Sequence, residues 1–226
     1  GRMYGEFDGI IGWQKNSYID YPGVLSTVLF YRGCNLRCPF CHNPQIVNGI
    51  LEEIDRGALR EFLKKRRGMI DGVVFTGGEP TLHDSIDTAA SFFRAEGYRI
   101  KLDTNGLLPE RIAALAPDYC ALDFKTSPSL YSSMLGSPYT DNSERLAAAV
   151  EYIKSLGENG EVRITLAPPL LNEQIVYEIA ERIAGVARVY LQQFNTREPL
   201  LDPSYNRLSP VSRETVLQYR DIIAPH

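Results

Sequence analysis

The residues best suited to chemistry are three cysteines, Cys34, Cys38 and Cys41, which fall within one stretch of eight residues. They directly follow an apolar run at residues 24–30. Thiolates this close together can bind one metal centre, and soft sulfur ligands select iron–sulfur clusters, zinc or copper. The spacing therefore predicts a metal site on the loop that follows the apolar run.

Three other interpretations of these cysteines have to be weighed. The segment Cys-Pro-Phe-Cys-His at 38–42 fits the attachment pattern of c-type haem, but that chemistry belongs to exported proteins and we expect no signal peptide here. A structural zinc site with His42 as fourth ligand is a common arrangement, although closed zinc sites usually draw their ligands from two separated pairs. A chain of 226 residues can bury a core without a disulfide inside one loop. The loop favours an iron–sulfur cluster over zinc and leaves zinc open.

Composition is that of an ordinary globular protein, with 44% hydrophobic and 23% charged residues. A net charge of −4 argues against non-specific nucleic-acid binding. No apolar run approaches the ~20 residues that span a bilayer, and four cysteines do not make a disulfide-rich secreted protein. We therefore expect a cytoplasmic protein without nucleic-acid or membrane partners. No break in composition divides residues 1–226, so we predict a single domain.

Strand and helix patterns alternate along the chain, which demands right-handed crossovers and a parallel sheet. Six such units are fewer than the eight that close a TIM barrel, which leaves an open, partial barrel or a flat doubly wound sheet. We expect the α/β fold to be an open, partial TIM-type barrel of six βα units, with its core at about 24–194 and a C-terminal extension with a helix at 195–226. The expected strands are 24–30, 73–76, 99–103, 119–124, 162–166 and 188–194, with a further short strand conceivable at 10–13; the expected helices include those capped by Asp55 and Asn172 and one from about Ser212 to Ile223.

Polar motifs follow the expected strands and do not precede them, as they should if the site lies at the carboxyl ends of a parallel sheet. Gly77-Gly78-Glu79-Pro80 follows the second strand, Asp103-Thr104-Asn105-Gly106 closes the third, and Arg163 lies on the fifth. A glycine pair is most often a turn, but it also lets backbone groups approach a ligand closely. One rim of the sheet is therefore expected to carry the metal loop, the glycine pair and the charged residues.

Several of these residues also have ordinary structural interpretations. Asp123 and Lys125, at the end of the fourth strand, could pair with each other, and Arg163 in an apolar strand needs a partner if it is buried. Cys120 is interpreted as a small core residue, and His83 as a residue at the start of a helix.

The cysteine loop, with Phe40 before its last cysteine, and the Gly-Gly-Glu-Pro motif together resemble the radical S-adenosylmethionine (SAM) enzymes, over about residues 13–194. In that superfamily three thiolates hold three irons of a 4Fe–4S cluster and SAM chelates the fourth, which accounts for three ligands where such a cluster normally takes four cysteines. Reductive cleavage of SAM gives a 5′-deoxyadenosyl radical that abstracts hydrogen, so the cofactor carries the chemistry. The resemblance implies Cys34, Cys38 and Cys41 as metal ligands, the backbone of Gly77, Gly78 and Glu79 at the SAM amino group, and Phe40 and His42 near the adenine.

Within that superfamily the chain is most similar to the glycyl-radical-enzyme activating enzymes. Residues 33–44, the Asp-Thr-Asn-Gly segment and Leu-Asp-Phe-Lys at 122–125 resemble their motifs, with Phe in place of a second Leu, and residues 16–23 resemble the anaerobic ribonucleotide reductase activating proteins in particular. In pyruvate formate-lyase activase the matching residues help hold a monovalent cation beside the SAM carboxylate, a role that suits oxygen ligands. The resemblance implies such a cation at Asp103, Thr104 and Asp123, with Lys125 near SAM and with Asn105 and Arg163 in the same cofactor-binding set.

The implied reaction removes the Cα hydrogen of a glycine in a partner glycyl-radical enzyme, expected to be an anaerobic ribonucleoside-triphosphate reductase. An electron donor such as flavodoxin or ferredoxin would supply the cluster. Only one cysteine lies outside the loop, so a second cluster is not expected. One alternative is an enzyme of the same superfamily that acts on a small molecule, like the carboxy-deazaguanine synthases. Another, of a different class, is a zinc-stabilised binding module without catalysis.

Overall fold

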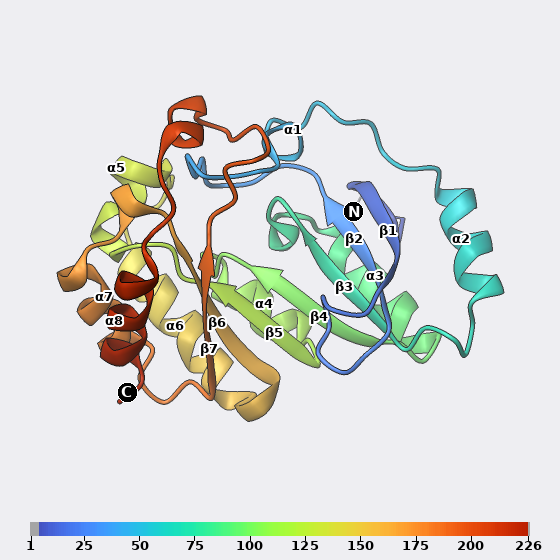
Figure 1. The fold of residues 1–226 in the computed structure, drawn as a ribbon. Coiled ribbons are helices and arrows are strands. Elements are labelled where there is room, and N and C mark those ends of the chain that lie inside the picture. The colour runs from blue at the N-terminus through green and yellow to red at the C-terminus, as the bar shows by residue number, and fades with distance from the viewer. Residues whose placement is uncertain (1–4, 226) are drawn as a thin grey trace. The chain divides into compact units, whose positions relative to one another are not determined.

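The computed structural model describes residues 5–225 and contains one seven-stranded sheet, in which the strands lie in chain order from β1 to β7 (Figure 1). The α/β class and the unclosed, mostly parallel sheet agree with the expected open fold. The strands are β1 (Ile10–Ser17), β2 (Ser26–Tyr31), β3 (Gly72–Gly77), β4 (Arg99–Thr104), β5 (Tyr119–Asp123), β6 (Gly160–Leu166) and β7 (Arg188–Gln193).

Helices occupy the crossovers that parallel strands require. Short 3₁₀ turns that begin with proline follow several strands, at Pro80–Leu82, Pro128–Leu130 and Pro168–Leu170, and a longer one spans Pro203–Arg207. The α-helices are α1 (Pro44–Val47), α2 (Arg56–Lys65), α3 (Ser85–Ala95), α4 (Pro109–Leu115), α5 (Tyr131–Leu135), α6 (Asn142–Ser155), α7 (Glu173–Arg182) and α8 (Arg213–Ile223).

Strand β1 is longer than expected and is antiparallel to β2, whereas the pairs β2–β3, β3–β4 and β6–β7 are parallel. The connection from Ser17 to Ser26 holds too few residues for a crossover, so the chain can only turn back on itself. The Ser17 hydroxyl stabilises this turn, since it accepts hydrogen bonds from the backbone N–H groups of Ile19 and Asp20. The sheet therefore has one strand more than the six predicted parallel ones.

By its internal contacts the chain forms two compact units, and a single domain remains a prediction. The first unit comprises residues up to Cys34, Gln45–Thr104 and Glu110–Cys120. Aromatic rings fill its core: Phe75 of β3 contacts Phe93 of α3 edge-on, with ring centroids 5.9 Å apart. Trp13 of β1 packs on Phe62 of α2 in the same way, at 4.9 Å.

The second unit comprises Asn35–Pro44, Asn105–Pro109 and the chain from Ala121 onward. Its longest helix, α6, buries an apolar stripe that includes Leu146, Val150 and Ile153, as its spacing predicts. Helix and strand approach closely where α6 leads into β6, because a Cβ on Gly160 would lie 2.2 Å from the carbonyl oxygen of Ile153. This glycine lets the crossover stay short.

The predicted helix boundaries agree with the structure to within a residue or two. Asp55 and Asn172 each accept a hydrogen bond from a backbone N–H in the first turn, and Ser212 does the same for α8. The inward face of α7 buries Val176, Ile179 and Ala180, whereas Ile175 is only half-buried. Among the described residues, no helix combines the length and the apolar character needed to cross a membrane.

The cap of α2 gives a direct test of this local analysis. Asp55→Ala removes the acceptor for the Ala58 N–H, now 3.0 Å from Asp55 Oδ1, and should lower the free energy of unfolding by about 1 kcal/mol. Asp55→Asn keeps an acceptor oxygen and should stay near the wild-type value. Urea unfolding of both variants is the measurement, and equal stability of Asp55→Ala and wild type would contradict the capping role.

Candidate cofactor site

None of the four cysteines forms a disulfide, and three of them lie on the loop that begins where β2 ends. Cys38 is buried, whereas Cys34 and Cys41 are half-buried. Within the second unit, the Cys41 N–H donates to the Cys38 carbonyl at 3.0 Å, so these two cysteines share one tight turn. No disulfide therefore engages the cysteines of this loop.

Backbone hydrogen bonds from distant segments hold the cysteine loop in the second unit. The Leu201 N–H donates to the Cys41 carbonyl at 2.9 Å, and the Asp202 N–H donates to the Pro39 carbonyl at 3.0 Å. The Arg37 N–H donates to the carbonyl of Leu135, the last residue of α5, at 2.7 Å. The C-terminal extension, expected to lie outside the functional core, therefore fixes the loop that carries the cysteines.

Burial raises the pKa of the Cys38 thiol, and the nearby Lys125 ammonium opposes that rise. Lys125 also lies over the ring of Phe40, with Nζ 5.5 Å from the ring centroid. A bound metal centre would supply the positive charge that stabilises a buried thiolate. These surroundings fit a thiolate that is bound to metal better than a free one.

The glycine pair at the end of β3 is packed against the first part of the cysteine loop. The Glu79 N–H donates to the Gly33 carbonyl at 2.8 Å, and the Gly78 N–H donates to the Tyr31 carbonyl at 3.0 Å. A Cβ on Gly78 would lie only 1.7 Å from the Gly33 carbonyl oxygen, so only glycine fits there. Because both N–H groups are used internally, this turn offers carbonyl oxygens to a ligand, which is what an ammonium group needs.

The Glu79 carboxylate is 1% exposed and serves the fold of the first unit. Its Oε1 accepts hydrogen bonds from the hydroxyls of Thr81 and Thr104, each at 2.7 Å, and from the Thr81 N–H at 3.3 Å. The side chain ties the end of β3 to the end of β4. Two of the residues predicted at the cofactor, Glu79 and Thr104, are therefore brought together.

In the second unit, Asp123 at the end of β5 has two cationic neighbours. Arg163 Nε lies 2.8 Å from Asp123 Oδ1, and Lys125 Nζ lies 3.8 Å from Oδ2. Both structural interpretations from the sequence are confirmed: Asp123 pairs with Lys125, and the charge of Arg163 has a partner. The set presents charged side chains at the carboxyl end of β5, where a ligand of an α/β sheet binds, and in the middle of β6.

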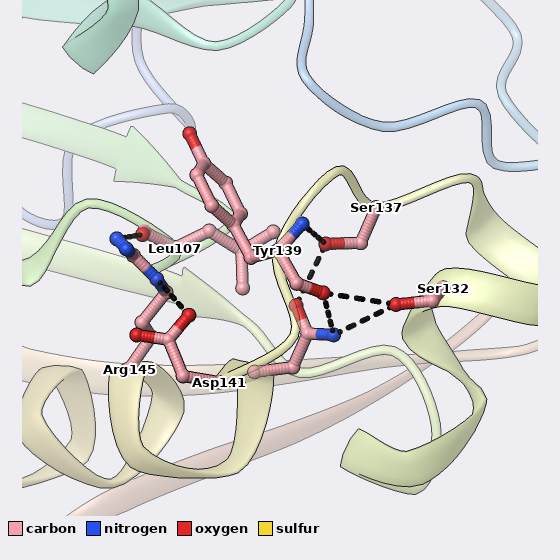
Figure 2. Close-up of polar contacts among 7 residues, drawn as sticks. Leu107, Ser132, Ser137, Tyr139, Asp141 and Arg145 are labelled. Carbon is pink, nitrogen blue, oxygen red and sulfur yellow. Dashed lines mark hydrogen bonds and ion pairs between the residues drawn. The ribbon is translucent and has the colours of Figure 1, made fainter.

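Asn105, from the Asp-Thr-Asn-Gly motif, contacts the cysteine loop and not solvent. Its Nδ2 donates to Asn35 Oδ1 at 2.7 Å, while its Oδ1 accepts from the Leu107 N–H at 3.1 Å. The Leu107 carbonyl in turn accepts a hydrogen bond from the Arg145 guanidinium, which also forms an ion pair with Asp141 at 2.7 Å (Figure 2).

The loop between α5 and α6 is itself held by polar contacts (Figure 2). Asn142 Nδ2 donates to the Ser132 hydroxyl and to the Tyr139 carbonyl, and Asn142 Oδ1 accepts from Ser137 at 2.7 Å. The Arg37 N–H of the cysteine loop donates to the carbonyl of Leu135 in this region, so the network also supports the cysteine loop.

A family model described as the radical SAM superfamily matches residues 28–183. The chain belongs to the radical SAM superfamily. Its cofactors are accordingly a 4Fe–4S cluster and SAM, and it is an enzyme.

Curated relatives of this radical SAM protein differ in what their names describe. The chain is 29% identical over 223 residues to a provisionally assigned glycyl-radical enzyme activating enzyme from Methanocaldococcus jannaschii, which covers 89% of this chain and 85% of the relative. It is 28% identical over 212 residues to the 7-carboxy-7-deazaguanine synthase of Hyperthermus butylicus, and the match covers 80% of this chain and 86% of that relative. Among solved structures, TYW1 with a lysine-pyruvate adduct bound matches with a TM-score of 0.63 and 16% identity, covering 91% of this chain and 76% of that one. The last similarity supports the fold alone.

Three thiolates on one loop are, by their chemistry, the donor set of a 4Fe–4S cluster that keeps one iron open. A cubane cluster places each thiolate on a different iron, whereas a single ion gathers its ligands around one point. Within the described part of the chain, no three His, Cys, Asp or Glu side chains gather in the latter way. Cys34, Cys38 and Cys41 remain the proposed ligands.

Other predicted residues have mixed outcomes. Phe40 is buried and His42 is exposed, and their place near the adenine stays a prediction. Cys120 is fully buried, as expected of a core residue. His83 lies two residues before α3, and its ring nitrogen Nε2 is hydrogen-bonded to the Arg32 carbonyl oxygen at 2.7 Å.

Sequence reasoning missed three features of the site region. Tyr131 is fully buried, and its hydroxyl accepts from the Lys125 N–H at 3.0 Å. The anchors at Leu201 and Asp202 act through backbone atoms and have no residue signature. Lys101 does have a signature in the sequence: it lies two residues before Asp103 on a strand, so the two side chains share a face.

Gly78→Ala tests the close approach at the glycine pair. The added methyl group cannot fit against the Gly33 carbonyl, so the loop must shift and the protein should reconstitute with much less iron and sulfide. Gly57→Ala, in α2, is the matched control, because a Cβ there meets only the Asp55 carboxylate at 3.2 Å. Iron and sulfide analysis after anaerobic reconstitution is the measurement. Wild-type iron content in Gly78→Ala would contradict the packing described.

Proposed function

We propose that this chain is a glycyl-radical-enzyme activating enzyme, with an anaerobic ribonucleoside-triphosphate reductase as its partner. It would remove the Cα hydrogen of a glycine on a loop of that partner. The observation that carries the proposal is the similarity along nearly the whole chain to the activating enzyme relative from M. jannaschii. The motifs at 33–44, 103–106 and 122–125 lie within the aligned family region and support the same assignment.

Each part of the chain has a distinct role in this proposal. Cys34, Cys38 and Cys41 hold the cluster, and the carbonyl oxygens of the Gly77–Gly78 turn receive the SAM amino group. The cluster and SAM, once bound, supply the radical chemistry. The chain contributes the remaining functions: it orients the cofactor through charged groups at Asp123, Lys125 and Arg163, and it excludes water around the buried Cys38 and Phe40.

A protein substrate suits a sheet that ends in an exposed edge strand. β7 pairs with β6 and forms one end of the strand order, and its Tyr190 and Gln192 side chains are exposed. Register pairs Arg163 with Tyr190 and Thr165 with Gln192, so these four side chains share one face. This polar face could receive a flexible loop. A cytoplasmic location and an electron donor such as flavodoxin or ferredoxin complete the proposal.

A second function, a reaction on a small molecule like that of the 7-carboxy-7-deazaguanine synthases, is favoured by the similarity to the H. butylicus enzyme. The first function leaves an unpaired electron on a glycine of the partner protein, whereas the second acts on a small molecule and leaves no glycyl radical. Mixing the reduced, SAM-loaded protein with candidate reductases should give a persistent glycyl radical signal by electron paramagnetic resonance. Turnover of a small-molecule substrate with no such signal on any reductase would favour the second function.

Cys38→Ala should abolish the cluster and SAM cleavage, because two remaining thiolates cannot hold the cube. Cys120→Ala is the matched control, because Cys120 is buried in the core near the amino end of β5. This substitution should leave the cluster and SAM cleavage unchanged. Anaerobic reconstitution followed by chromatographic assay of 5′-deoxyadenosine is the measurement. Retained SAM cleavage in Cys38→Ala would rule out the cluster assignment.

A further inference from the structure

Lys101, in the middle of β4, is a buried cation. Its side chain is 4% exposed and that of Asp103 is 10% exposed, and the two are joined by an ion pair of 2.9 Å between Nζ and Oδ1. Nζ also lies 5.8 Å from the ring centroid of Tyr119. All three residues belong to the first unit.

The pairing follows from the strand. Residues two apart on a strand point to the same face, so Lys101 and Asp103 lie side by side. A buried ammonium is stable only with a partner, and the Asp103 carboxylate and the face of the Tyr119 ring both attract a positive charge. The ion pair is therefore a buried interaction within β4 and not a surface contact.

Asp103 is also the residue at which the family resemblance implies a monovalent cation. A sodium or potassium ion on this carboxylate would lie within a few ångströms of the Lys101 ammonium, in surroundings that screen the repulsion poorly. Thr104, a second implied ligand, donates its hydroxyl hydrogen to Glu79 at 2.7 Å and keeps its oxygen lone pairs, so the misfit lies at the carboxylates and not at this residue. Asp123, the third, has Arg163 and Lys125 as neighbours. The residues present do not fit an additional cation at Asp103.

We propose that the Lys101 ammonium takes the place of a monovalent cation, so that SAM binding by this chain does not depend on sodium or potassium. The chain would carry the required positive charge as a side chain. Lys101 then acts as a positioning residue, since it holds the Asp103 carboxylate at the end of β4. The inference rests on membership of the radical SAM superfamily and not on the identity of the substrate.

The first measurement needs no variant. SAM binding to the reconstituted wild-type protein is titrated by calorimetry in potassium, sodium or choline chloride at equal ionic strength, without any partner protein. Choline is too large to replace a sodium or potassium ion at the Asp103 carboxylate. We expect equal dissociation constants in the three salts. Affinity that is several-fold higher in potassium or sodium would overturn the proposal.

The second measurement removes the charge. Lys101→Met keeps the length of the apolar stem, removes the ammonium from the ion pair with Asp103, and should weaken SAM binding in choline chloride by about tenfold. Potassium should then restore most of the affinity and also raise the melting temperature of the variant, because an ion that binds only the folded state stabilises it. Lys154→Met, which breaks a surface pair of 2.8 Å with Glu151, is the matched control and should show neither effect.

The outcomes separate the alternatives. Unchanged SAM affinity in a folded Lys101→Met protein would overturn the proposal, as would a loss that no cation restores. If Lys101→Met fails to fold, Lys101→Arg keeps the charge and should bind SAM equally in choline and potassium. Since no assay uses a glycyl-radical enzyme, failure of the proposed partner function would leave these results unaffected.

Discussion

Three cysteines can hold a metal cluster only if the backbone between them keeps one conformation, and this backbone has no repetitive structure of its own. Every buried N–H and C=O group of such a loop needs a partner from elsewhere. Here the partners come from separate parts of the chain. Backbone hydrogen bonds join Gly33 to Ile46 and to Glu79, Arg37 to Leu135, and Cys41 to Leu201. These anchors lie on α1, at the end of α5, after β3 and in the segment that follows β7.

The polar side chains near the loop follow the same logic. Most hold one another in place: Glu79 joins the ends of β3 and β4 through Thr104, and Asn105 joins its turn to the loop through Asn35. Charges are paired within the sheet, Asp103 with Lys101 and Asp123 with Arg163. Within each unit these pairs form without any cofactor, which lowers the free energy spent on ordering these side chains when a ligand binds.

Much of this could be predicted from sequence because strand patterns and turn residues are local signals. The polar motifs were placed correctly at strand ends since parallel strands share one carboxyl edge. The full length of β1 was not predicted, although the short connection from Ser17 to Ser26 leaves only the antiparallel arrangement. The anchors at Leu201 and Asp202 could not be predicted, because they depend on backbone pairing between distant residues. Lys101 was overlooked although its spacing from Asp103 was visible; its burial, which gives the pair its meaning, is a tertiary property.

The central claim is that Cys34, Cys38 and Cys41 hold a 4Fe–4S cluster with one iron left open for SAM. The most direct test is electron–nuclear double resonance of the reduced, reconstituted protein with SAM labelled by ¹⁷O in its carboxylate and ¹⁵N in its amino group. We expect hyperfine coupling from both labels, which requires direct binding to an iron of the cluster. A cluster spectrum without coupling to either label, or a colourless protein that retains zinc, would contradict the account.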